Sequence, residues 1–109
     1  VLAETDVINM VSRGIATPDI LKGIHLSMAS RIGKLLKVTG VKDGVALMTG
    51  GLALDTGLVA AIQEEMVNEK VTVKATSHPD SIYAGAIGAA LWGAFRHAKL
   101  QELKEKAAA

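Results

Sequence analysis

Two adjacent glycines are the residues of this chain whose type and position best suit contact with a ligand. Thr49, Gly50 and Gly51 follow a short apolar run at residues 44–48 and precede a helical pattern that begins near Asp55. Glycine lacks a Cβ, so the backbone here can approach a phosphate, a ribose or a base edge, and the amides of a helix start favour negative charge. The pattern therefore indicates either a nucleotide contact or a tight structural turn.

The glycine pair does not belong to either of two common phosphate-binding signatures. No Gly-Lys-Ser/Thr follows the pair, which excludes a Walker loop, and Gly50, Gly51 and Gly57 lack the spacing of the dinucleotide fingerprint. The pair is a weak signal by itself. What favours a ligand is its expected place at the carboxyl end of a parallel strand, where α/β folds bind ligands and where we expect free amide N–H groups.

The other reactive side chains form no catalytic or metal-binding group. Glu4 and Asp6 lie two residues apart on different faces of a predicted helix, and Asp55 is better placed to cap one. The absence of cysteine excludes disulfides and thiolate-held metals or iron–sulfur clusters supplied by this chain alone. Three histidines lie far apart, without metal-ligand spacing: His25, His78 and His97. We expect a chain that binds a ligand but performs no chemistry alone.

Composition limits the partners that the chain can have. Its 109 residues suffice for one domain or part of one, and half of them are apolar with only 3% aromatic, which predicts an aliphatic core. Twelve basic and eleven acidic residues are spread along the chain, so no nucleic-acid surface is expected. The longest apolar stretch, residues 84–95, is too short to span a bilayer. We expect a cytoplasmic protein that contacts neither nucleic acid nor membrane.

Hydrophobic periodicity predicts four helices and two strands in the order ααβαβα, which is an α/β fold. The predicted elements are helices at residues 4–13, 17–39, 55–66 and 81–100 or beyond, strands at 44–49 and 71–73, and a loop at 77–80.

The ends of these elements carry recognisable signals. Gly14 is placed to stop the first helix, Thr17 to cap the second with Pro18 at its first position, and Asp55 to cap the third. The predicted buried stripe of the third helix consists of Leu58, Val59, Ile62 and Met66.

Two parallel strands joined by a right-handed helical crossover make a sheet that is too small to be complete. The first strand is apolar on both faces, as in strands covered on both sides. Natural domains avoid exposed edges of this kind, so we expect other sequence or a partner chain to complete the sheet. The start at Val1 rather than methionine also suggests a piece of something longer.

The predicted fourth helix has one face almost without side chains. Gly85, Ala89 and Gly93 step by four residues, and each interior glycine costs about 1 kcal/mol of helix propensity relative to alanine. Close packing against another helix or a sheet is one explanation, and lining a nucleotide cleft is the other.

Several segments together resemble a known family. They are residues 1–8 (VLAETDVI), 19–25 (DILKGIH) with 27–31 (SMASR), 48–53 (MTGGLA) and 85–91 (GAIGAAL), in that order. The chain resembles the C-terminal part of the ATP-binding subunits of benzoyl-CoA reductase and of the 2-hydroxyacyl-CoA dehydratase activators, within the actin/Hsp70/sugar-kinase superfamily. The loop at 77–83 is more similar to the D-type reductase subunits than to the activators.

This resemblance implies a partial actin-like (ribonuclease H-like) ATPase domain with an incomplete parallel sheet. It assigns Thr49, Gly50 and Gly51 to the adenosine side of a nucleotide site, and the glycine-rich last helix to a helix that transmits cleft closure. The family couples hydrolysis of Mg-ATP to low-potential electron transfer through a [4Fe–4S] cluster. The implied partners are a related ATPase subunit and the substrate-reducing subunits, with a homodimer of the fragment as a further possibility.

The departures from the family limit what this chain can do. The family's cluster cysteines, catalytic acid and phosphate motifs precede the segment that begins at Val1, so we expect no cluster ligand and no ATP hydrolysis from this chain. Residues 1–100 would be the C-terminal portion of the ATPase domain, and 101–109 a charged, alanine-ended tail. The alternatives are a small-molecule (sugar) kinase of the same superfamily and a non-enzymatic module that dimerises.

Overall fold

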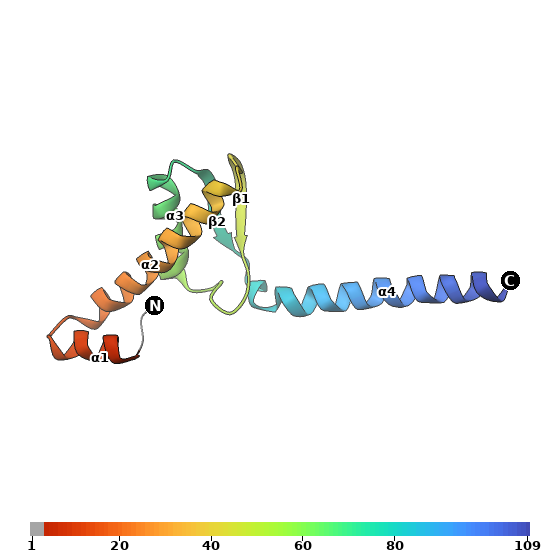
Figure 1. Cartoon of the computed structure of the whole chain (residues 1–109), viewed down its shortest axis with the longest axis horizontal. Coiled ribbons are helices and arrows are strands. Elements are labelled where there is room, and N and C mark those ends of the chain that lie inside the picture. The colour runs from red at the N-terminus through yellow and green to blue at the C-terminus, as the bar shows by residue number, and fades with distance from the viewer. Residues whose placement is uncertain (1–3) are drawn as a thin grey trace.

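The computed structural model describes residues 4–109, so the start of the first family-like segment, residues 1–3, lies outside the described residues. The described chain is a mixed α/β structure with the predicted order ααβαβα (Figure 1). Its elements are α1 (Glu4–Ser12), α2 (Thr17–Val38), β1 (Asp43–Met48), α3 (Thr56–Asn68), β2 (Thr72–Ser77), a short 3₁₀ helix η1 (Ser81–Tyr83) and α4 (Ala84–Ala108).

Two of the three predicted helix-end signals are confirmed. Gly14 follows α1 with a φ of 78°, as a helix stop requires, and Asp55 caps α3 through its side chain. The prediction for Thr17 is wrong, because the N-cap of α2 is Ala16. The Ala16 carbonyl accepts the first helical hydrogen bond, from the Ile20 N–H at 3.2 Å, so Thr17 is already helical and its hydroxyl caps nothing.

The two strands pair in parallel, as the crossover through α3 requires. The register runs from Asp43 opposite Thr72 to Met48 opposite Ser77. Strand β2 starts one residue later than predicted and continues four residues further, through the polar segment 74–77. Pairing with β1 extends this strand, because a hydrogen-bonded neighbour overrides the weak strand propensity of lysine and alanine.

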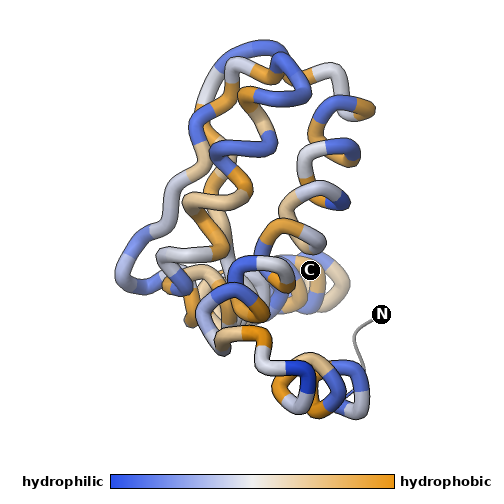
Figure 2. The backbone as a smooth tube through the Cα atoms, turned by 90° about the vertical axis from the view of Figure 1, so that its left-hand side faces the viewer, coloured by the Kyte–Doolittle hydropathy of each residue, from blue (hydrophilic) through white to orange (hydrophobic). Residues whose placement is uncertain are grey.

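Helices α2 and α3 lie on one face of the sheet and enclose the core with it (Figure 1). In Figure 2, hydrophobic positions recur between hydrophilic ones along the helices, as packing on one side predicts. Leu58, Ile62 and Met66 of α3 are fully buried, and Val59 packs at the edge of the same cluster. The predicted stripe of α3 is therefore the centre of the core.

The opposite face of the sheet is bare. Val45 and Leu47 point to this face and are 65% and 56% exposed, so coverage on both sides is not provided by residues 4–109. Helix α4 extends away from the sheet instead of folding back over it (Figure 1), and the molecule measures 74 × 33 × 23 Å.

Helix α4 is long, continuous and unpartnered within the described chain. It runs to Ala108, so the predicted tail at residues 101–109 is almost entirely helical. The division of the chain into an ATPase portion and a tail at residue 100 stays a prediction. A Cβ added at Gly85, Gly88 or Gly93 would meet no atom within 4 Å. The close packing expected of this small-residue face therefore needs a partner beyond residues 4–109. None of the described helices is long and apolar enough to cross a membrane.

Candidate functional site

The predicted site is the turn that leads from β1 into α3. Gly50 has a φ of 96°, a conformation that side chains with a Cβ rarely adopt. Its N–H donates to the carbonyl of Ser81 at 3.0 Å, and its own carbonyl accepts from the N–H of the buried Ala53 at 3.1 Å. Gly50 therefore serves the turn itself and ties it to the connection between β2 and α4.

The expectation of free amides is wrong for Gly50, because Ser81 accepts its N–H. Gly51 is different. Its N–H has no acceptor among residues 4–109, and a Cβ built on it would meet nothing within 4 Å. Its φ lies outside the left-handed region, so another residue could adopt its conformation. Within the described chain, neither strain nor crowding requires glycine at this position.

Asp55 holds the far end of the turn with both of its carboxylate oxygens. Oδ1 accepts from the Leu58 N–H at 2.9 Å, which is the predicted cap of α3, and Oδ2 lies 3.1 Å from Nε2 of His25 on α2. The hydrogen bond from the Leu58 N–H is the main cause that lowers the pKa of Asp55 below its ordinary value, and the nearby His25 acts in the same direction. Sequence reasoning missed His25, because the contact joins residues thirty positions apart.

Thr49 lies in an apolar hollow of about 320 Å³ at the carboxyl ends of both strands. Its lining residues are Leu47, Thr49, His78, Asp80, Ser81, Ala84, Ile87, Gly88 and Leu91. Gly50 and Gly51 are not part of this lining, so the structure places the three predicted residues in one turn but only Thr49 in the hollow. The 78–81 loop was identifiable in advance, because it follows the neighbouring parallel strand.

The 78–81 loop is internally braced. Ser81 is buried, and its Oγ accepts from the His78 N–H at 2.9 Å, while the Asp80 N–H donates to Nδ1 of His78 at 3.1 Å. Because the Ser81 carbonyl also holds Gly50, this loop supports the turn from one side.

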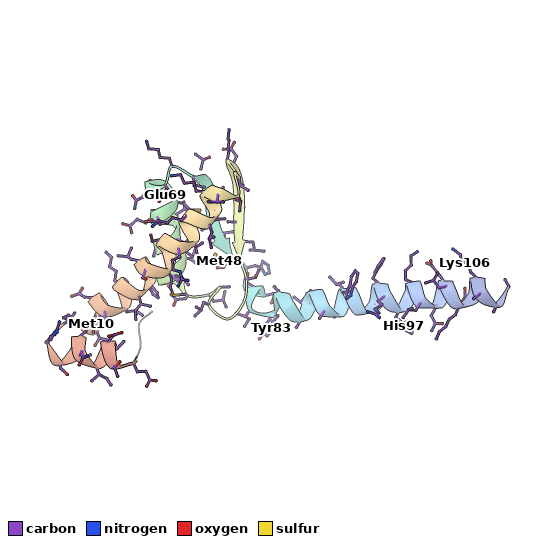
Figure 3. The ribbon with its side chains drawn as sticks, viewed as in Figure 1. Met10, Met48, Glu69, Tyr83, His97 and Lys106 are labelled. Carbon is purple, nitrogen blue, oxygen red and sulfur yellow. The ribbon has the colours of Figure 1, made fainter. Side chains whose placement is uncertain are left out.

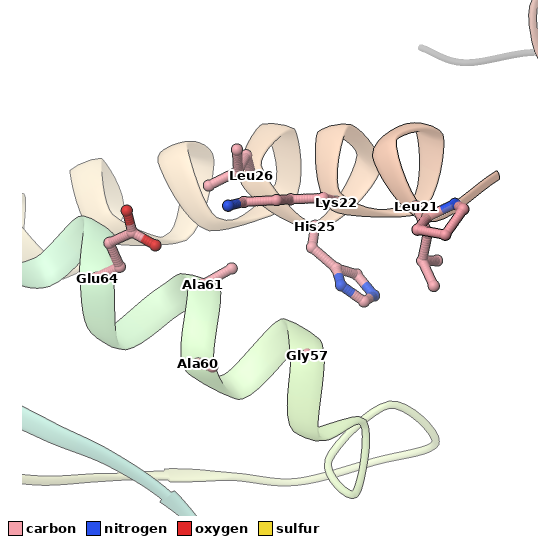
Figure 4. Close-up of a pocket in the computed structure, with 9 residues that line it drawn as sticks. Leu21, Lys22, His25, Leu26, Gly57, Ala60, Ala61 and Glu64 are labelled. Atoms are coloured by element: carbon pink, nitrogen blue, oxygen red, sulfur yellow. The ribbon is translucent and has the colours of Figure 1, made fainter. Parts of the chain in front are cut away.

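A second hollow of about 400 Å³ lies between α2 and α3 (Figure 4). His25 projects from α2 toward Gly57 of α3 and forms part of its wall, together with Lys22 and Glu64. The hollow therefore lies on the α2 side of the same turn.

The residues present do not fit a metal or an iron–sulfur cluster. Within residues 4–109 no three His, Cys, Asp or Glu side chains gather closely enough to hold a metal ion, and the sequence contains no cysteine. The turn can offer backbone groups to a ligand.

The chain matches known proteins along nearly all of its length. Residues 1–93 match the BadF/BadG/BcrA/BcrD ATPase family. The chain is 66% identical over 106 residues to the D-type subunit of benzoyl-CoA reductase from Thauera aromatica, which covers 97% of this chain and 38% of that protein. It is 42% identical over 100 residues to the "(R)-2-hydroxyglutaryl-CoA dehydratase activating ATPase" of Acidaminococcus fermentans, covering 91% of this chain and 36% of that protein.

A third relative is also matched along nearly the whole of this chain. The "2-hydroxyisocaproyl-CoA dehydratase activator" of Clostridioides difficile is 39% identical over 107 residues, covering 97% of this chain and 37% of that protein. The chain thus spans less than two fifths of the length of these relatives. No solved structure matches it significantly.

Proposed function

Because the chain belongs to the BadF/BadG/BcrA/BcrD ATPase family, we propose that it is the C-terminal portion of the ATP-hydrolysing, electron-activating subunit of a benzoyl-CoA reductase. The 66% identity to a D-type reductase subunit, against 42% and 39% to two dehydratase activators, supports the reductase assignment. Residues 1–100 would form part of an actin-like, ribonuclease H-like ATPase domain, and 101–109 its tail.

In this proposal the turn at Thr49, Gly50 and Gly51 faces the adenosine side of the nucleotide. The observation that carries it is Gly51, which is a glycine with an open N–H although neither its φ nor its surroundings within residues 4–109 demand one. A ligand that approaches the backbone closely explains both features.

The remaining functions of the subunit fall to residues outside this chain. ATP hydrolysis, the Mg²⁺ ion and the [4Fe–4S] cluster need acids and cysteines that residues 4–109 do not bring together. The complete subunit would couple hydrolysis to low-potential electron transfer and so drive reduction of an aromatic acyl-CoA.

The proposed partners are a related ATPase subunit and the substrate-reducing subunits. The bare small-residue face of α4 supports a further contact, because Gly85 and Gly93 on it have open space where a Cβ would lie. That contact would be the other half of the ATPase, or a second copy when the chain is isolated. Use of ATP is consistent with a cytoplasmic subunit.

The variant Gly51→Ala tests the role of the turn. In the complete subunit we expect its ADP dissociation constant, measured by isothermal titration calorimetry, to rise about tenfold, which corresponds to about 1.4 kcal/mol. Its melting temperature should not change, because the added Cβ meets no atom of the chain.

Gly23→Ala is the matched control, since Gly23 also has open space around it but lies within α2. We expect wild-type affinity for this variant. If Gly51→Ala also bound ADP with wild-type affinity, the turn would not be part of the nucleotide site.

A further inference from the structure

Asp55 makes a contact that capping a helix does not require. One side-chain oxygen is enough to cap α3, and Oδ1 does this at the Leu58 N–H. Oδ2 lies within hydrogen-bond distance of His25 on α2, a helix that precedes β1 in the chain and is therefore separate from the turn and from α3. This second bond therefore connects α2 to the end of the turn, in addition to the cap within α3.

The His25 side chain is held closely at this position. It is only 13% exposed, and its ring lies against Gly57 in the first turn of α3 (Figure 4). A Cβ at residue 57 would come within 2.7 Å of Cε1 and 2.8 Å of Nδ1 of the ring. Glycine near the start of α3 thus provides the space that lets the imidazole reach Asp55.

The turn is consequently held at two points by two different elements. Gly50 is bound to Ser81 after β2, and Asp55 is bound to His25 on α2. Between these points Ala53 donates to Gly50 and Asp55 donates to Leu52, so the turn has little freedom of its own. The open amide of Gly51 lies between the two anchors, and its direction depends on both.

We propose that His25 is a positioning residue for the nucleotide turn, acting through the carboxylate of Asp55. The imidazole N–H donates to Oδ2 and sets the place of the turn relative to α2. The Gly51 amide is thereby presented to the ligand in one orientation. This inference rests on the proposed function, because the effect on binding requires that the turn contact a nucleotide.

His25→Leu tests it by removing the donor while keeping a side chain of similar volume. In the complete subunit we expect the ADP dissociation constant to rise about five- to tenfold. His25→Gln should restore most of the affinity, because its amide N–H₂ can replace Nε2 as a donor to Asp55. Asp55→Ser retains a cap for α3 but is too short to reach His25, so it should match His25→Leu. The double variant, His25→Leu with Asp55→Ser, should bind ADP no more weakly than either single variant, because both substitutions remove the same interaction.

Wild-type affinity in His25→Leu would overturn the proposal, and so would an equal loss in His25→Leu and His25→Gln, which would indicate packing alone. A second measurement separates this inference from the proposed function. In the same subunit labelled with ¹⁵N-glycine, His25→Leu should shift the Gly51 amide resonance from its wild-type position. His25→Gln should bring the resonance back toward that position. If ADP did not bind at all, the proposed function would fail, and this resonance would still decide whether His25 positions the turn.

Discussion

At the scale of single residues, the two glycines of the turn have different reasons to be glycine. Gly50 has a positive φ and is bound to Ser81, so its role is conformational. Gly51 is under neither constraint within the described chain, and in the proposed function its backbone instead faces the nucleotide. Asp55 completes the turn as a carboxylate that accepts two hydrogen bonds from different elements.

The charge of Asp55 should make stability depend on pH. Its folded-state pKa is lowered, mainly by the Leu58 N–H, so its contribution is fully present above the unfolded pKa of about 4 and is lost as the pH falls through the folded value. Urea unfolding of the wild type and of Asp55→Asn should show a difference at pH 7 that shrinks below about pH 4. A difference that stayed constant down to pH 2 would show that the carboxylate charge plays no part.

At the scale of elements, α3 joins the sheet to α2. Its buried side chains form the centre of the core, and its polar ones secure its neighbours. Gln63 accepts from the Ala75 N–H at 2.8 Å and so satisfies a backbone group of β2, while Lys37 of α2 pairs with Glu69, just after α3, at 2.7 Å. The Lys37 hydrogen bond lowers the pKa of Glu69, although a pair this exposed adds little stability.

Packing of α3 should therefore dominate stability. Ile62→Ala removes a fully buried side chain, and we expect it to lower the free energy of unfolding by about 2–5 kcal/mol. Val67→Ala on the same helix is the control, because Val67 is 67% exposed and its loss should cost less than about 0.5 kcal/mol. Chemical denaturation of both variants measures the difference. If both variants lost a similarly small amount of unfolding free energy, the core would not centre on α3.

At the scale of the whole molecule, the chain is too extended to bury its apolar surface alone. Its radius of gyration is 20.5 Å, whereas a compact domain of this length has about 13 Å. Helix α4 has no buried residue, and Figure 3 shows side chains along it, such as His97 and Lys106, with no other element beside them. Leu91, Trp92 and Phe95 are all exposed on this helix, and an apolar surface of this kind is typical of an interface with another chain.

The isolated chain should therefore associate. We expect light scattering after size exclusion to give at least the mass of a dimer, and Leu91→Asp with Phe95→Asp to reduce it to a monomer. Lys104→Asp is the control, because it changes charge on α4 without touching the apolar patch. A monomeric wild-type chain would argue against α4 as an interface.

Much of this protein could be read from the sequence, because the decisive signals are local. Helical periodicity, the Asp55 cap and the stop at Gly14 depend on neighbours within a few residues, and the structure confirms them. The order ααβαβα follows from such signals, as does the family, whose segments lie in sequence order. The Thr49–Gly51 turn was located in the same way, from a strand, two glycines and a helix start.

Tertiary structure decided what depends on distant residues. The extension of β2 needed β1 beside it, and the N–H of Gly50 was taken by Ser81, thirty-one residues later in the chain. Only the packing of α2 on α3 brings His25 to Asp55, and no local pattern marks that pair. The same holds for the direction of α4, since a helix carries its own hydrogen bonds but not the surface against which it packs.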